Sequence, residues 1–176
     1  VAVQGVGHVG MNLCRLLHEA GATLLVADVN RDNLKAVSKE MPVEIIAPAE
    51  ILYADADVIA PCALGNVLSS ATIPRIKAKV IAGAANNQLS TEADGARLMQ
   101  RGILYAPDYV INAGGIISVS HEYRGISSEE QVRKDVARIP ERLDAIFAEA
   151  LDTGRPTNEL ADELARRLIA NGRNEG

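Results

Sequence analysis

Aromatic residues and cysteines are scarce in this sequence. Its 176 residues include no Trp, one Phe and two cysteines, and aromatic residues make up 3% of the chain. Hydrophobic residues reach 48%, so the core must be built from Val, Ile, Leu and Ala, which suits strands covered by helices. Cys14 and Cys62 lack metal-ligand spacing, and so few cysteines favour a reducing, cytoplasmic setting. We therefore predict neither a metal site nor a disulfide framework.

Long apolar runs and a positive net charge are also missing. The sequence has no signal peptide, no apolar stretch of transmembrane length, no low-complexity tract and no internal repeat. The formal net charge is −5, so neither nucleic acid nor an anionic membrane surface would attract the protein electrostatically. We expect a soluble protein that binds neither, and any anionic ligand must be held by local geometry.

Apolar runs alternate with helical patterns along the chain, which is typical of βαβ units and a parallel sheet. Strands are predicted over residues 1–4, 23–28, 43–47, 57–61, 80–84 and 103–105. Helices are predicted over 9–20, 31–40, 49–53, 91–101, 114–123, 129–152 with a break at Pro140, and 158–171, followed by a frayed tail over 172–176. The fold class is α/β: a Rossmann-type, doubly wound, mostly parallel sheet with helices on both faces and a helical C-terminal extension.

The domain organisation follows from the same pattern. Residues 1–125 are predicted to form the Rossmann core, and residues 126–176 to form helices that pack on it. The chain opens directly on the hydrophobic strand Val1-Ala2-Val3-Gln4 without an initiator Met, and a buried strand rarely starts a natural protein. We therefore expect the chain to be one domain of a longer polypeptide.

A glycine-rich loop follows the first strand. Gly5, Gly7 and Gly10 form G-x-G-x-x-G between that strand and the first helix, where Val9, Leu13, Leu16 and Leu17 are expected on one face. The first glycine permits a tight turn, the second lets the backbone approach a pyrophosphate, and the third allows close helix–strand packing. The helix N-terminus then faces the phosphates with its free N–H groups and partial positive charge. The alternative is a glycine turn without a ligand.

A carboxylate ends the second strand. Asp28 lies where dinucleotide-binding folds place the acid that accepts hydrogen bonds from the adenine ribose hydroxyls. A 2′-phosphate there would be repelled, because like charges about 4 Å apart interact unfavourably by on the order of a few kcal/mol at an intermediate dielectric. NAD is therefore favoured as the cofactor. Arg31 could counterbalance this repulsion and leaves NADP open as the alternative.

Three later segments carry a family resemblance. They are Pro61-Cys62-Ala63-Leu64-Gly65, Ala82-Gly83-Ala84-Ala85-Asn86-Asn87-Gln88-Leu89 and Ala106-Pro107-Asp108-Tyr109-Val110-Ile111-Asn112-Ala113-Gly114-Gly115. Each follows or adjoins the carboxyl end of a predicted strand, where ligands bind in open parallel sheets. In this order, they resemble successive motifs of leucine and phenylalanine dehydrogenases, in the glutamate/leucine/phenylalanine/valine dehydrogenase superfamily. The resemblance covers residues 1 to about 125.

The resemblance implies site residues. It places Asn86 at the nicotinamide ribose, Asn112 at the nicotinamide carboxamide and Asn87 at the amino group of the substrate. The predicted cofactor-binding residues are Gly5, Gly7, His8, Val9, Gly10, Asp28, Val29, Cys62, Ala63, Leu64, Ala84, Asn86 and Asn112. The alternative for the paired asparagines is a turn in which they bond their own backbone.

Substrate choice is predicted from Ile116 and Val119. They lie three apart at the start of a helix and therefore project on one face, and the resemblance maps both onto positions that touch the substrate side chain. Two branched residues leave less room than smaller or more flexible ones, which favours an aliphatic amino acid. Asn87, Ile116 and Val119 are thus the predicted substrate-binding residues.

The activity implied by the resemblance is the reversible, NAD-dependent oxidative deamination of an L-amino acid to the 2-oxo acid and ammonia. The family supplies its catalytic lysines and aspartate from an N-terminal domain, so we assign no catalytic residue here and expect the isolated domain to be inactive. The expected partners are the amino acid, the upstream catalytic domain and further copies in a homo-oligomer. Alternatives are a noncatalytic NAD-sensing module and a different dehydrogenase with the same cofactor fold.

Overall fold

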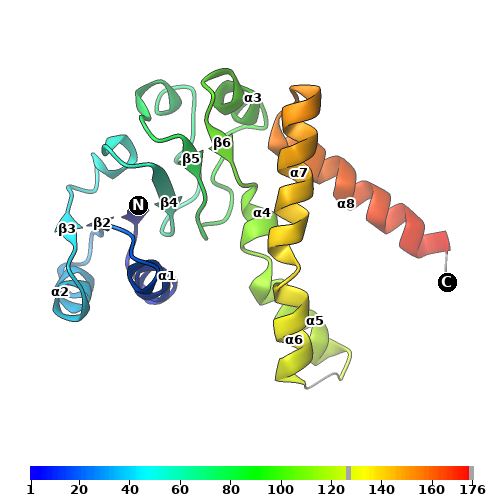
Figure 1. Ribbon diagram of the computed structural model, residues 1–176, viewed down its shortest axis with the longest axis horizontal. Helices are drawn as coiled ribbons and strands as arrows, with labels where there is room; N and C mark the ends of the chain where they lie inside the picture. The colour runs from blue at the N-terminus through cyan, green and yellow to red at the C-terminus, as the bar shows by residue number, and fades with distance from the viewer. Residues whose placement is uncertain (126–127, 175–176) are drawn as a thin grey trace.

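The computed structural model describes residues 1–125 and 128–174, with side chains up to residue 170 (Figure 1). Six parallel strands form one sheet in the order β3-β2-β1-β4-β5-β6. The strands are β1 (Ala2–Gln4), β2 (Leu25–Ala27), β3 (Glu44–Ile45), β4 (Val58–Pro61), β5 (Val80–Ile81) and β6 (Leu104–Tyr105). The strand order reverses between β1 and β4, which pair in parallel. Ligands bind at such a switch point, outside the carboxyl ends of the strands.

Helices cover both faces of the sheet. Figure 1 shows α1 (His8–Glu19) and α2 (Arg31–Glu40) on one face, opposite α3 (Ala93–Gln100). The connections that contain the 3₁₀ helices η1 (Ile51–Tyr53) and η2 (Ile73–Arg75) share the face of α3. The predicted fold class, a doubly wound Rossmann-type sheet, is confirmed.

Two apolar clusters fill the spaces on either side of the sheet. Neighbouring strand residues alternate between them: Ala2 and Ile59 belong to one cluster, and Val3 and Ala60 belong to the other. This alternation follows from the two-residue repeat of a strand, and burial on both faces explains the continuous apolar runs. Tyr105 is the one aromatic side chain in the buried core of the described residues. The core is therefore the aliphatic one that the composition predicts.

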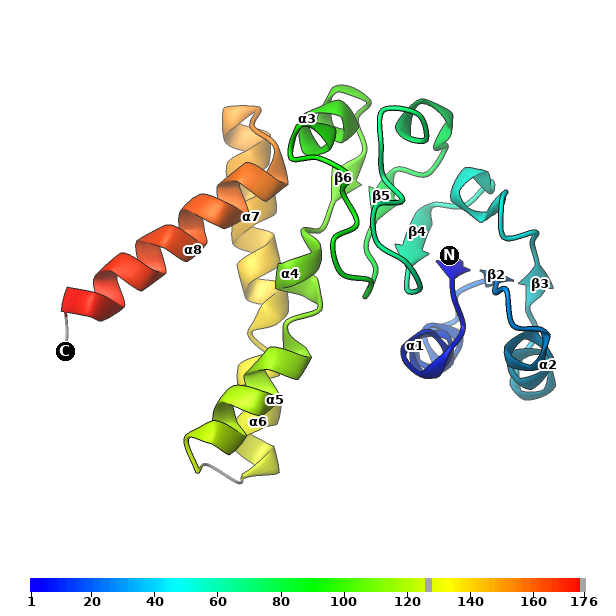
Figure 2. The same ribbon diagram turned by 180° about the vertical axis from the view of Figure 1, so that it is seen from behind.

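Five helices follow β6: α4 (Asp108–Ile111), α5 (Gly114–Tyr123), α6 (Glu129–Val136), α7 (Ile139–Thr153) and α8 (Thr157–Asn174). Figure 2 shows α7 and α8 beside the β6 end of the sheet. The Thr157 hydroxyl donates to the Tyr105 carbonyl (2.7 Å), and the Tyr109 hydroxyl donates to the Asn158 carbonyl (3.1 Å). In the part of the chain with coordinates, no helix combines the length and apolar character needed to cross a bilayer.

Several predicted boundaries are corrected. The break predicted at Pro140 lies just before it, between α6 and α7, because Pro fits the first turn of a helix but not its interior. The helix predicted over 49–53 is the 3₁₀ helix η1, and α4 and η2 were not predicted. The last helix continues to Asn174, so residues 172–174 are helical rather than frayed, and residues 126, 127, 175 and 176 lie outside the described part.

The predicted face of α1 is also wrong in part. Val9 and Leu16 are exposed, whereas Gly10 and Cys14 are buried against the sheet. The helix approaches β1 through its small residues, because a side chain at position 10 would meet the backbone of Gly5. Val9 and Leu16 are thereby turned away from the core, whereas Leu13 and Leu17 are partly buried against it.

Candidate functional site

The glycine loop after β1 contains two glycines that the fold itself requires. Gly5 has φ +92°, and a Cβ there would lie 2.6 Å from the Cβ of Ala63. A Cβ on Gly10 would overlap the Gly5 carbonyl oxygen. Gly7 differs, because no atom lies within 4 Å of a Cβ built at that position. The chain therefore leaves open space at Gly7, where a ligand can approach the backbone.

The N-terminus of α1 faces the same space without a protein partner. Its first hydrogen bond runs from the Met11 N–H to the Gly7 carbonyl (2.9 Å), so the preceding N–H groups have no helical acceptor. Across the described residues no side chain caps Gly7, and the first turn of α1 carries no acidic residue. Free N–H groups and the positive end of a helix dipole together favour an anion such as a pyrophosphate.

Asp28 holds the glycine loop in place. Its carboxylate accepts hydrogen bonds from the N–H groups of Val6 (2.8 Å) and Asn30 (2.7 Å) and from the Asn33 side-chain amide (3.1 Å). Partial burial acts to raise the pKa of Asp28, but these hydrogen bonds hold it below its ordinary value. The side chain is half-buried, and a carboxylate can accept about four hydrogen bonds. It therefore stays charged and retains capacity for a ribose hydroxyl.

The segments after β4 and β5 lie against each other at the carboxyl edge of the sheet, beside the glycine loop. The Asn66 N–H donates to the Asn87 carbonyl (2.6 Å), and the Ala85 N–H donates to the Pro61 carbonyl (2.8 Å). A Cβ on Gly65 would lie 2.8 Å from the Asn87 carbonyl oxygen. Close backbone packing thus accounts for a glycine at the end of the segment 61–65.

The predicted asparagines meet across a long stretch of sequence. The Asn112 side-chain amide donates to the Asn86 side-chain oxygen (2.7 Å) and to the Ala84 carbonyl (3.3 Å). The Asn86 side chain is thus engaged by Asn112. Asn87 has a left-handed backbone conformation with φ +53°. This conformation agrees with the alternative prediction that the paired asparagines form a turn. The structure brings Ala84, Asn86 and Asn112 together.

Two buried polar residues of this site received no role from the sequence. Gln88 is fully buried, and its side-chain amide donates to the Gly83 (2.8 Å) and Ala85 (2.9 Å) carbonyls. Asp108 is buried and accepts from the Gln88 N–H (3.2 Å). Both lie inside the segments that carry the resemblance, which was the available signal. They hold the loop after β5 against the start of α4.

The cysteines are packed thiols. Burial raises the pKa of Cys14 to about 11 and also raises the pKa of Cys62. Neither side chain is therefore a thiolate near neutral pH. Within the residues that have coordinates, no cluster of His, Cys, Asp and Glu side chains could hold a metal ion. His8 is exposed in the first turn of α1, beside the glycine loop.

Several predicted site residues are apolar side chains exposed to solvent. Their exposed fractions are Val9 54%, Val29 90%, Leu64 72%, Ile116 68% and Val119 57%. Val9, Leu13 and Leu16 line a hollow of about 300 Å³ whose other wall includes Ala84 and Ile111. Exposed apolar side chains beside a hollow are suited to contact with the rings of a bound ligand or with further protein.

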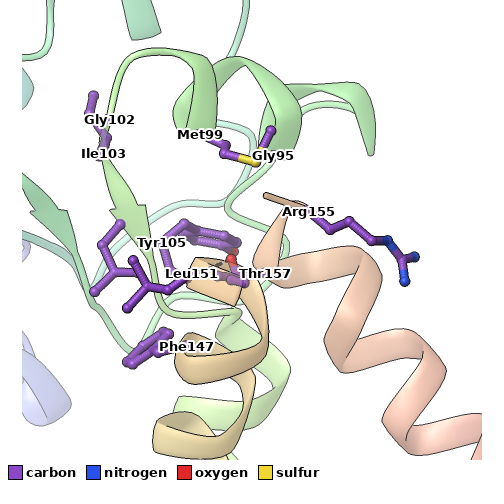
Figure 3. Close-up of a pocket in the computed structure, with 11 residues that line it drawn as sticks. Gly95, Met99, Gly102, Ile103, Tyr105, Phe147, Leu151, Arg155 and Thr157 are labelled. Carbon is purple, nitrogen blue, oxygen red and sulfur yellow. Dashed lines mark hydrogen bonds between the residues drawn. The ribbon is translucent and has the colours of Figure 1, made fainter. Parts of the chain in front are cut away.

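Among the described residues, the substrate-assigned Asn87 and Ile116 line different hollows. Asn87 lines a hollow with Asp108 and Tyr109, whereas Ile116 lines a separate one with His121. A third hollow of about 210 Å³, between α3, β6 and α7, contains none of the predicted site residues. Figure 3 shows it bounded by apolar side chains such as Phe147, Leu151 and Tyr105. The candidate site is therefore the edge built from the glycine loop, Asp28 and the asparagines.

Comparisons with known proteins agree in one family. A family model described as Glutamate/Leucine/Phenylalanine/Valine dehydrogenase matches residues 24–163. Leucine dehydrogenase from Thermoactinomyces intermedius is 45% identical over 169 residues, which are 96% of this chain and 46% of that protein. L-tryptophan dehydrogenase from Nostoc punctiforme is 47% identical over 174 residues, which are 98% of this chain and 49% of that protein.

Solved structures extend the comparison to three dimensions. The crystal structure of L-tryptophan dehydrogenase from Nostoc punctiforme superposes with a TM-score of 0.92 at 47% identity, over 98% of this chain and 52% of that chain. The chain thus spans about half the length of these relatives. The three segments that carry the predicted resemblance all lie within the range of the family match. The chain therefore belongs to the glutamate/leucine/phenylalanine/valine dehydrogenase family of amino acid dehydrogenases.

Proposed function

We propose that this chain binds NAD and forms the cofactor half of an amino acid dehydrogenase. One observation carries the proposal: the carboxylate of Asp28 accepts the Val6 N–H and so holds open the space at Gly7, in front of the uncapped N-terminus of α1. In this arrangement the free N–H groups bind the pyrophosphate, and Asp28 accepts from the adenine ribose. The same carboxylate repels a 2′-phosphate, which favours NAD over NADP.

The proposed reaction is the reversible oxidative deamination of an L-amino acid to the 2-oxo acid and ammonia. When bound, NAD would supply the hydride acceptor for the α-carbon. Asn86 and Asn112 orient the nicotinamide end, and Asn87 contacts the amino group of the substrate. Support comes from relatives named leucine and L-tryptophan dehydrogenase. We place the acid–base residues in an upstream domain of a full-length homo-oligomer, and relatives about twice as long as this chain are consistent with a further domain.

The proposed substrate is aliphatic. Ile116 and Val119 are both exposed on α5, so they are available to line one wall of a pocket. Branched side chains at both positions narrow that wall and favour leucine or valine. Identity to relatives does not decide the substrate, because leucine and L-tryptophan dehydrogenases match this chain almost equally well.

A noncatalytic NAD-sensing module is the second candidate. Such a module needs only the glycine loop and Asp28. It provides no reason for the hydrogen bond between Asn112 and Asn86, or for Gln88 and Asp108 holding the adjoining loop. These contacts favour a dehydrogenase.

Calorimetric titration of the 176-residue chain tests the proposal. NAD should bind more tightly than NADP, and Asp28→Ser should narrow the difference. Since Asp28 also holds the Val6 N–H, thermal unfolding of the variant must show that it is folded. Equal affinity of the unmutated chain for both cofactors would overturn the preference, and no binding of either would overturn the proposed function.

A second experiment tests where the catalytic groups lie. The purified chain with NAD and leucine should produce no NADH above background, whereas the full-length protein should. Amino-acid-dependent NADH production by the isolated chain would show that its own residues supply the acid–base chemistry.

A further inference from the structure

A basic hollow of about 290 Å³ lies between α5 and the junction of α6 and α7, outside the proposed cofactor site. Its lining side chains are Ile116, Ile117, Ser120, His121, Arg124, Asp135, Arg138 and Arg142. The three arginines come from the end of α5, the α6–α7 junction and the first turn of α7. The fold therefore gathers them from positions up to 18 residues apart (142 − 124).

These arginines lack ion-pair partners. Over the described residues, no carboxylate lies within ion-pair distance of Arg124, Arg138 or Arg142, and no hydrogen bond from their guanidinium groups is present. Arg15 and Arg155, by contrast, pair with glutamates at 2.7 and 2.6 Å. In a chain of net charge −5, three unpaired guanidinium groups around one hollow are an unusual concentration of positive charge.

The remaining polar side chains of the lining compensate this charge only in part. Asp135 is the one carboxylate in the lining, and its Oδ2 lies 2.7 Å from Nε2 of His121. The hydrogen bond from His121 and the nearby Arg138 hold the pKa of Asp135 below its ordinary value, so it is ionised. The lining thus carries three positive charges and one negative charge, a net +2 before any charge on His121. The Nδ1 atom of His121 is buried and has no hydrogen-bond partner among the described residues.

The start of α7 adds to the same imbalance. Arg138 is its N-cap residue and makes no side-chain capping bond, and Arg142 lies one turn later. Cations at a helix N-terminus are disfavoured by the helix dipole, whereas an anion there is stabilised. Glu141 in the first turn of α7 and Asp135 in the lining offset part of this positive charge, and solvent screens the exposed groups. A bound anion would pair with the guanidinium groups and with the helix end together.

We propose that this hollow binds a dianionic phosphate group, either inorganic phosphate or the phosphate of a small monoester. Planar guanidinium groups bind tetrahedral oxyanions through paired N–H donors, and a dianion matches the net charge of +2. The hollow shares α5 with Ile116, so its occupant contacts the helix that carries the proposed substrate-facing side chains. The site does not depend on NAD binding.

Calorimetric titration of the 176-residue chain with inorganic phosphate, at ionic strength held constant with sodium chloride, tests the proposal. Saturable binding is expected. The double variant Arg138→Gln/Arg142→Gln should weaken it by at least about tenfold, since two of the three guanidinium groups of the lining are removed. Arg166→Gln is the matched control, because Arg166 is exposed on α8, outside this hollow, and the variant should bind as the parent does.

Two further arms separate the alternatives. Gly7→Ala should retain phosphate binding at the basic hollow, because the glycine loop is a different anion site. Titration with glycerol phosphate in place of inorganic phosphate shows whether the hollow prefers a monoester or the free ion. Equal binding by the parent and the double variant would overturn the proposal, as would an effect no larger than that of chloride. Loss of phosphate binding in the full-length protein would also overturn it and would assign the arginines to an acidic surface of the remaining polypeptide.

Discussion

The glycine loop and helix α5 both belong to the proposed site, but the rest of the chain covers them to very different extents. Gly5, Val6 and Gly10 are buried, and their positions are determined by backbone contacts within the fold. Helix α5 contains no buried residue and exposes Ile116 and Val119. The glycine loop is therefore constrained by this chain, whereas α5 is available for contacts that this chain does not supply.

The difference shows how a single edge of a sheet can combine two kinds of residue. Gly5 and Gly10 are required by the fold, so their substitution changes stability, whereas Gly7 faces open space and its substitution should change affinity. On α5 the proposed recognition residues Ile116 and Val119 should have little effect on folding, because removing a solvent-exposed side chain leaves no cavity. Substitutions in the two regions should therefore change the free energy of unfolding by different amounts, with the largest change in the glycine loop and the smallest on α5.

Gly10→Ala should have the largest effect. Its Cβ would overlap the Gly5 carbonyl oxygen, so α1 and β1 must separate, and the free energy of unfolding should fall by on the order of 3 kcal/mol or more. Gly7→Ala is the matched control: it should change stability by less than about 0.5 kcal/mol and weaken NAD binding by at least about tenfold. Urea unfolding measures the stability change, and calorimetry measures the affinity for NAD. Comparable destabilisation by the two variants would contradict the proposal that Gly10 is required for folding and Gly7 for binding.

Asp28→Asn should have an intermediate effect. The substitution keeps the shape but places an amide against the N–H groups of Val6 and Asn30, so stability should fall by about 1–3 kcal/mol. The pKa of Asp28 is lowered in the folded chain. The stabilisation that the Asp28 carboxylate gives the fold is therefore complete above the pKa of aspartate in the unfolded chain, about 3.9. It is lost as the pH falls through the pKa of Asp28 in the folded chain.

Unfolding measured across a pH series checks this sign. The stability difference between the parent and Asp28→Asn should be constant from about pH 8 to pH 5 and should narrow in acid. A difference that grows as the pH falls would mean that the Asp28 carboxylate does not stabilise the loop.

Ile116→Ala and Val119→Ala should have the smallest effect on folding. Both side chains are exposed, so each change should alter the free energy of unfolding by less than about 0.5 kcal/mol. In the full-length protein, kcat/KM for leucine and valine should fall by about tenfold or more. Tyr123→Ala is the control on the same helix, because Tyr123 is exposed but has no proposed substrate contact.

Steady-state kinetics decide this last prediction. A kcat/KM for phenylalanine above that for leucine and valine in the unmutated protein would remove the case for an aliphatic pocket. A substrate ranking left unchanged by both variants would show that Ile116 and Val119 do not form its wall.

Much of the fold was predictable because its signals are local. The alternation of apolar runs and helical patterns predicts a parallel sheet with strands near the observed positions. The break between α6 and α7 follows from Pro140, since Pro fits only the first turn of a helix. The exposure of Val9 and Leu16 was not predictable from periodicity, because α1 buries Gly10 and Cys14 most deeply and packs Leu13 and Leu17 only partly against the core.

The sequence by itself determined the fold class, the family and the positions of the glycine loop and Asp28, because each depends on residues close together in the chain or in a short ordered pattern. Only the tertiary structure decided which distant residues meet. Asn112 bonds Asn86 across 26 residues, and the three arginines of the basic hollow come together only when α5 lies beside the start of α7. Such contacts depend on how helices and loops pack, and local sequence periodicity carries no information about that packing.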